Sequence, residues 1–255
     1  MNNNKRNFFL QDEESDFMPM VPITENDSEQ DKNMVIPTEI PILPLRNTVL
    51  FPGVVLPITV GRDKSIKAVN DAYKSDKLIG VVAQKDSNIE DPEVKDLCDI
   101  GTVAKIVKLI KMPDGGTTII IQGKKRFELL DVTVVDPYFK ASIKVLEDDE
   151  KPTTDNFEAL IASIKDLATQ IIQLSPNLPS EAAIILKNIE NPSFLINFVS
   201  SNQNTDLTEK QSLLATHDVT TRAEKLIQLL QRELQFAELK DKVTNKTRTE
   251  IDKQQ

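Results

Sequence analysis

The feature that most constrains the fold of this sequence is an apolar run interrupted by prolines. Residues 40–60 read IPILPLRNTVLFPGVVLPITV, with Pro41, Pro44, Pro52 and Pro57 among β-branched and aromatic residues that favour strands. Proline fixes φ and lacks the backbone N–H, so it removes a hydrogen bond from the ladder of a central strand. The run therefore predicts short strands joined by bends, with prolines at edges, strand starts or bulges.

Similar runs continue to about residue 150. LIGVVAQ (78–84) is typical of a strand, and two apolar runs flank Asp114-Gly115, a strong hairpin signal. The stretch from Lys124 onward supplies two more strands, and a helix is predicted with Asp63 as its N-cap. Six or so short strands and one helix predict an α+β fold, in which residues 38–150 form a small barrel-like sheet domain.

Near residue 150 the apolar period changes from 2 to 3.6. NFEALIASIKDLATQIIQL (156–174) has one apolar helical face, and three shorter helical segments follow it. Residues 218–255 contain no glycine or proline, and their apolar stripe ends at Val243. We expect an all-α bundle over 151–217 and a long C-terminal helix over 218–255.

Charge and composition limit the class of protein. The net charge is −9, and residues 1–37 carry 3 basic and 8 acidic side chains, which indicates a disordered acidic leader. The remaining chain is close to neutral, so nucleic-acid binding is not expected. No apolar run approaches the roughly 18 residues of a membrane span. A single cysteine, Cys98, fits a reducing compartment, and we expect a cytoplasmic protein.

No motif for catalysis, metal binding or cofactor binding stands out. Gly123-Lys124 lacks the earlier glycine of a phosphate-binding loop, because Thr118 occupies that position. The single histidine, His217, lies between predicted helices and is interpreted as a solvated linker residue. Cys98 is interpreted as a small core residue. We therefore expect a non-catalytic chain.

Two surfaces are candidates for contacts with other molecules. Lys124, Lys125 and Arg126 could touch a phosphate backbone, but Phe127 alternates inward beside them, so a solvent-facing position is preferred. The stripe of the last helix is expected to be core over residues 219–237, and over residues 236–243 a contact with a partner or substrate is comparably favoured. The expected contact residues are Phe51, Leu234, Phe236, Leu239 and Val243.

Several motifs in order resemble the amino-terminal region of the ATP-dependent Lon proteases. The resemblance covers about residues 38–250. It includes LPLR, FPG and VGR near the start, DIGTVAKI in the middle and IIIQGKKRFEL further on. The residues that carry this signature are Leu43, Pro44, Leu45, Arg46, Phe51, Pro52, Gly53, Gly61, Arg62, Gly101, Gly123 and Arg126.

The resemblance implies a PUA-like β-domain followed by a helical bundle and a long helix. In that family these modules recognise unfolded or degron-bearing proteins and help to hold a hexamer together. The ATPase and serine–lysine protease domains follow them, so ATP and Mg²⁺ are expected only outside this sequence. The chain resembles an N-terminal fragment, for which a monomer or a weak oligomer is expected.

Two alternatives remain open from the sequence. The chain could be a stand-alone adaptor that presents proteins to other machinery, or a PUA-like module that binds RNA. The acidic balance weighs against RNA.

Overall fold

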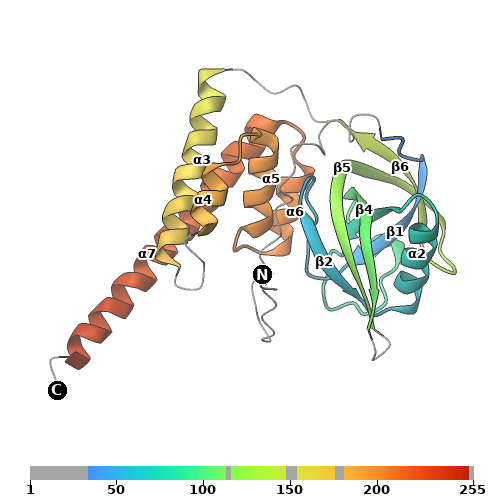
Figure 1. Cartoon of the computed structure of the whole chain (residues 1–255), viewed down its shortest axis with the longest axis horizontal. Coiled ribbons are helices and arrows are strands. Elements are labelled where there is room, and N and C mark those ends of the chain that lie inside the picture. Colours follow the sequence, from blue (N-terminus) through green and yellow to red (C-terminus); the bar gives the residue numbers. More distant parts are fainter. Residues whose placement is uncertain (1–33, 113–115, 148–153, 176–180, 253–255) are drawn as a thin grey trace, which may run out of the picture.

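The computed structural model describes residues 34–112, 116–147, 154–175 and 181–252, with side chains as far as Val243. Figure 1 shows two lobes. We call the strands with helix α2 (Asp63–Lys74) the β lobe, and helices α3 to α7 the helical lobe. Most of the predicted acidic leader and the predicted turn at Asp114-Gly115 lie outside the described residues. The mixed α+β class is confirmed.

One six-stranded sheet forms the β lobe. Its order is β2-β5-β4-β3-β1-β6, and β5 also pairs with β6. Strands β1 and β3 run parallel, and the other pairs are antiparallel. The strands are β1 (Glu39–Leu45), β2 (Val55–Val60), β3 (Leu78–Ala83), β4 (Ile100–Lys111), β5 (Thr117–Val134) and β6 (Lys140–Leu146).

The prolines occupy positions where the ladder needs no donor. Pro57 lies in β2, which stands at one end of the strand order, as expected. Strand β1 is internal, so an edge position is wrong for Pro41 and Pro44. However, β1 pairs with β6 over residues 39–41 and with β3 over residues 42–45. The Ile42 N–H donates to the Phe139 carbonyl, next to β6, at 2.8 Å. Backbone nitrogens alternate between the two sides of a strand, so the nitrogen of Pro44 faces the β6 side, where β1 is no longer paired. The nitrogen of Pro41 faces the β3 side, where pairing begins only at residue 42.

Strand β5 is a single strand of 18 residues where the sequence predicts two. The predicted break at Gly123-Lys124 is wrong, because both residues continue the strand. The register between β4 and β5 shifts here, because Val103 pairs with Lys125 and the next residue, Ala104, pairs with Gly123, which leaves Lys124 as an extra residue in β5. The length of β5 lets it contact β2, β4 and β6.

The helical lobe matches the expected pattern of one long helix, three short ones and a final long one. Thr154 and Asp206 accept hydrogen bonds from helical N–H groups at 3.2 and 2.8 Å, and Asn191 caps the helix that begins at Pro192. The bounds are α3 (Asp155–Leu174), α4 (Glu181–Lys187), α5 (Pro192–Asn202), α6 (Leu207–Ala215) and α7 (Val219–Asp252).

One apolar core runs through both lobes. A large cluster joins Leu43 and Ile121 of the sheet to Leu195 of α5 and Leu226 of α7. A smaller cluster lies within the β lobe around Phe127. The domain boundaries at residues 150 and 217 stay predictions. Among the described residues, no helix is long and apolar enough to cross a membrane, and no cluster could hold a metal ion.

Candidate functional site

The first signature residues build the interior of the β lobe. Leu43 and Leu45 in β1 are 1% and 5% exposed, and Pro44 between them is also buried. Gly101 in β4 passes so close to β3 that a Cβ atom would lie 2.4 Å from the Val81 carbonyl oxygen. Arg46 is exposed just after β1. Most of this part of the signature therefore specifies packing.

The FPG motif forms a turn that contacts the helical lobe. The Val54 N–H donates to the Phe51 carbonyl at 3.2 Å, and Gly53 has a φ of +81°, so glycine is needed at this position. The amide of Asn197 in α5 donates to the Pro52 carbonyl at 3.3 Å. A Cβ atom on Gly53 would lie 2.6 Å from the ring of Phe194. The turn therefore packs directly against α5.

Gly123 lies directly under this turn. The Gly53 N–H donates to the Gly123 carbonyl at 2.8 Å, and the Gly123 N–H donates to the Val54 carbonyl at 2.9 Å. A Cβ atom on Gly123 would lie 2.3 Å from the Phe51 carbonyl oxygen. Two separate signature motifs therefore meet at one point of the β lobe.

The prediction that residues 124–126 present their charges to solvent is wrong for Arg126. Its side chain is only 1% exposed, and Nη1 donates to the carbonyls of Leu214 and Thr216 at 3.0 and 3.1 Å. These carbonyls lie at the C-terminal end of α6, where the helix dipole favours a cation. Arg126 therefore joins β5 to the helical lobe. Lys125, in contrast, pairs with Glu147 at 2.9 Å near the surface.

Arg222 in α7 is a contact that the sequence reasoning missed. It is 1% exposed, and its Nε and Nη2 atoms donate to the Thr216 carbonyl at 3.0 and 2.8 Å. A signal was present, since Arg222 stands on the apolar stripe beside Val219 and Ala223. We call the contacts of Phe51–Val54, Gly123, Arg126 and Arg222 the inter-lobe joint.

Phe51 does not fit the expected contact with a substrate. Its side chain is 0% exposed, because it belongs to the core that both lobes share. Leu234 is half-buried and packs against the same core. Both side chains therefore support the fold.

The remaining predicted contact residues form an exposed apolar surface. Phe236, Leu239 and Val243 are 66%, 60% and 65% exposed. Figure 1 shows the C-terminal part of α7 extending beyond the other helices. By contrast, Leu230 and Leu226, about two and three turns before Phe236, are buried. We call Phe236, Leu239 and Val243 the α7 strip; their contact with a substrate or partner stays a prediction.

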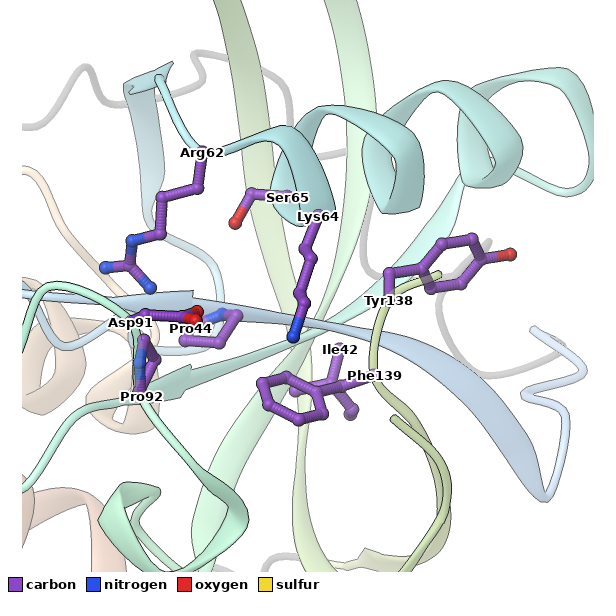
Figure 2. Close-up of a pocket in the computed structure, with 9 residues that line it drawn as sticks. All are labelled: Ile42, Pro44, Arg62, Lys64, Ser65, Asp91, Pro92, Tyr138 and Phe139. Atoms are coloured by element: carbon purple, nitrogen blue, oxygen red, sulfur yellow. The ribbon is translucent and has the colours of Figure 1, made fainter. Parts of the chain in front are cut away.

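A small pocket lies at the start of α2 in the β lobe (Figure 2). The predicted N-cap, Asp63, is the first helical residue, and the signature residue Arg62 takes the N-cap position after the exposed Gly61. Burial lowers the pKa of Arg62, and the nearby charge of Arg46 lowers it further. We call this hollow the α2 pocket.

A buried glutamine that the sequence reasoning missed holds the α2 pocket in shape. Gln84 is 0% exposed and accepts a hydrogen bond from Nη2 of Arg62 through its Oε1 atom. Its amide nitrogen donates to the carbonyls of Ile89 and Asp86 at 2.9 and 3.3 Å. The loop that carries Asp91 is thereby fixed relative to α2.

Comparisons with known proteins agree on one family. Residues 39–232 match the model of the ATP-dependent protease La (LON) substrate-binding domain. Lon protease from Flavobacterium johnsoniae is 50% identical over 245 residues, and Lon protease from Cytophaga hutchinsonii is 44% identical over 247 residues. Each match covers 96% of this chain and 30% of the relative. The chain thus spans about 30% of the length of these relatives.

A solved structure supports the same assignment. The N-terminal domain of the Mycobacterium avium complex Lon protease has a TM-score of 0.63 at 25% identity. The match covers 76% of this chain and 98% of that one. Together with the family model, which extends across both lobes, these likenesses show that the chain belongs to the family of the ATP-dependent protease La (LON) substrate-binding domain.

Proposed function

We propose that this chain selects unfolded or degron-bearing proteins for an ATP-dependent serine protease of the Lon type. The observation that carries the proposal is the α7 strip, three large apolar side chains that are each at least 60% exposed and that follow the buried first part of the same helix. A surface of this kind makes tolerant apolar contacts with many sequences. It belongs to a chain whose family is a substrate-binding domain.

The proposal places ATP hydrolysis and peptide-bond cleavage in other domains of the complete protein. Gly123 is not part of a phosphate-binding loop, since it lies inside β5, where the Phe51 carbonyl oxygen would lie 2.3 Å from a Cβ atom. ATP and Mg²⁺ would be bound elsewhere. We also propose a cytoplasmic location. For the β lobe we propose a PUA-like, barrel-like arrangement, and the additional pairing of β5 with β6 supports it.

We further propose that α7 contributes to a homo-oligomer, a hexamer in the complete protein and a monomer or weak oligomer for this chain. The exposed side chains of the α7 strip support this proposal, because a second copy of the helix would bury them. Substrate and second copy would then compete for one surface.

The test is a binding titration with a permanently unfolded polypeptide, such as a reduced and carboxymethylated protein carrying a fluorescent label. The wild-type chain should bind it with micromolar affinity, and the pair Phe236→Asp and Leu239→Asp should weaken binding at least about tenfold. The matched control is the pair Gln231→Asp and Gln235→Asp, which adds two charges at exposed positions of the same helix. Equal losses in both pairs, or no binding by the wild-type chain, would overturn the proposal.

A further inference from the structure

The second half of β4, with the residue that follows it, has a surface that is both basic and apolar. Two large apolar side chains, Val107 and Met112, are 54% and 45% exposed. Three exposed lysines lie in the same stretch, Lys105, Lys108 and Lys111. Figure 1 shows this end of β4 at one tip of the β lobe. We call these five residues the basic tip.

The basic tip has an open strand edge. Strand β3 pairs with β4 over residues 102–105, and beyond Lys105 the only described strand that pairs with β4 is β5. An open edge offers backbone N–H and C=O groups to another extended chain. The lysines, and the bulge at Val107 where the register shifts, oppose pairing with a second copy of this edge, because like charges repel. An acidic chain would meet attraction in place of that repulsion.

The lysines of the basic tip are not paired with acidic side chains. None of the described residues in 100–112 and 116–126 is acidic. Within the described parts of the chain, none of the three lysines forms an ion pair. Asp76 lies near β4, since the Ile106 N–H donates to the carbonyl of the next residue, Lys77, at 2.8 Å. Its carboxylate, however, accepts a hydrogen bond from a backbone N–H of its own turn at 2.9 Å. The three lysines are therefore available to an anionic partner.

The acidic leader of this chain has a composition that complements the basic tip. Residues 1–37 carry 8 acidic and 3 basic side chains, whereas the chain from residue 38 onward is close to neutral. Within the leader, residues 8–16 read FFLQDEESD, which combines three apolar side chains with four carboxylates and contains no lysine, arginine or proline. Both the charge and the hydrophobicity of this segment therefore match the exposed side chains of the basic tip.

The leader joins the described part of the chain within reach of the basic tip. Met34 packs against the apolar cluster around Phe127, in the second half of β5. The basic tip pairs with the start of β5 near Thr117, and the strand from Thr117 to Phe127 is about 33 Å long. The chain between Asp16 and Met34 can extend over at most ~60 Å. Because the leader is tethered to the surface, even a weak intrinsic affinity would favour contact.

We infer that residues 8–16 of the acidic leader bind the basic tip of the same chain. The carboxylates of this segment pair with Lys105, Lys108 and Lys111, and its apolar side chains cover Val107 and Met112. The leader thereby keeps acidic segments of other proteins from the open edge of β4. This inference is independent of the α7 strip and of the proposed function.

The test attaches a nitroxide spin label to the leader of the full chain through Ser15→Cys, in a Cys98→Ala background, and measures the broadening of backbone amide signals by NMR. We expect strong broadening at Val107 and Lys108, and none at Ile184, an exposed residue of α4 in the other lobe. About 1 M salt should abolish the broadening, because the Debye length falls to ~3 Å.

Two pairs of lysine variants with the same change of charge separate a specific contact from general attraction. Lys108→Glu with Lys111→Glu should lower the equilibrium constant for leader binding about tenfold. Lys144→Glu with Lys187→Glu changes two exposed lysines elsewhere and should leave the broadening unchanged.

The leader offers a matched pair of its own. Replacing the four carboxylates of residues 12–16 with amides should abolish the broadening at the basic tip. The same replacement of the four carboxylates of residues 25–31 removes equal charge from the leader and should preserve the broadening.

Absence of broadening at the basic tip overturns the inference, and the lysines then serve only to keep the edge of β4 from pairing. Equal effects of the two lysine pairs, or of the two sets of carboxylates, also overturn it, because the attraction would then be unspecific. If a spin-labelled, unenriched chain broadens the signals of an isotope-enriched chain without a label, the leader binds a second copy, and binding within one chain is overturned.

Discussion

Arg126 in β5 and Arg222 in α7 donate hydrogen bonds to the same atom, the carbonyl oxygen of Thr216, at 3.1 and 3.0 Å. Both side chains are 1% exposed. Thr216 is the C-cap of α6, where backbone carbonyls lack helical donors and the helix dipole is negative. The two guanidinium groups therefore satisfy one helix end from opposite lobes.

Replacing Arg126 with methionine should destabilise the whole chain. The substitution keeps much of the side-chain volume but leaves the Leu214 carbonyl without the donor it has at 3.0 Å. A loss of about 2 kcal/mol in the free energy of unfolding is expected, measured by urea titration. Lys125→Met is the control and should change stability by about 0.5 kcal/mol or less, because Lys125 pairs with Glu147 at the surface. Similar losses in both variants would contradict the assigned role of Arg126.

Gly123→Ala should be far more harmful than Gly61→Ala. The new methyl group at residue 123 would lie 2.3 Å from the Phe51 carbonyl oxygen, a backbone atom that cannot move alone. A loss of about 3 kcal/mol is expected. At residue 61 nothing lies within 4 Å of a Cβ atom, so alanine there should be neutral or slightly stabilising. Thermal melting of the two variants side by side checks this difference.

A charge introduced into α7 should destabilise the fold at a buried position and have little effect at an exposed one. Leu230→Asp introduces a carboxylate at a site that is 3% exposed and should cost about 4 kcal/mol or prevent folding of the helical lobe. Phe236→Asp changes a side chain that is 66% exposed and should alter stability by about 0.5 kcal/mol. Helix signal and cooperative melting measure both. Unfolding by Phe236→Asp would place that side chain in the core.

Asp218 should make the start of α7 sensitive to acid. Its carboxylate accepts hydrogen bonds from the hydroxyl and N–H of Thr221, both at 2.6 Å, and these hold its pKa below the ordinary value of 3.8. Because the folded pKa is lowered, the stabilisation is present above pH 3.8 and disappears as the pH falls through the folded value. Asp218→Asn keeps an acceptor for the N–H but does not titrate, so it should lose less stability between pH 5 and about pH 2.5. Equal acid sensitivity in both proteins would contradict this.

Local signals in the sequence predicted the elements well. The short strands of the proline-rich run and the periodicity of α3 each depend on neighbours within a few residues. Strand β5 was divided wrongly because glycine usually interrupts a strand. Here the absence of a side chain at Gly123 is what allows another segment to approach.

The contacts between lobes were harder to predict because they join distant residues. Arg126 lies in a basic triplet, and only the position of α6, 88 residues later, shows that it is buried. The carbonyls that bind Arg126 and Arg222 belong to the backbone, which is the same in every residue type, so the sequence does not reveal them.

The inter-lobe joint also determines where mechanical force would enter the β lobe. Tension applied along α7 would pass through Arg222 to the Thr216 carbonyl and from there through Arg126 into β5. At Arg126 that strand pairs with Thr102 on one side and Leu146 on the other. The load would therefore reach an interior point of the sheet, where ladder hydrogen bonds on both sides share it, and not a free strand end from which they could be peeled one by one. A β lobe loaded in this way should therefore resist unzipping when α7 is pulled.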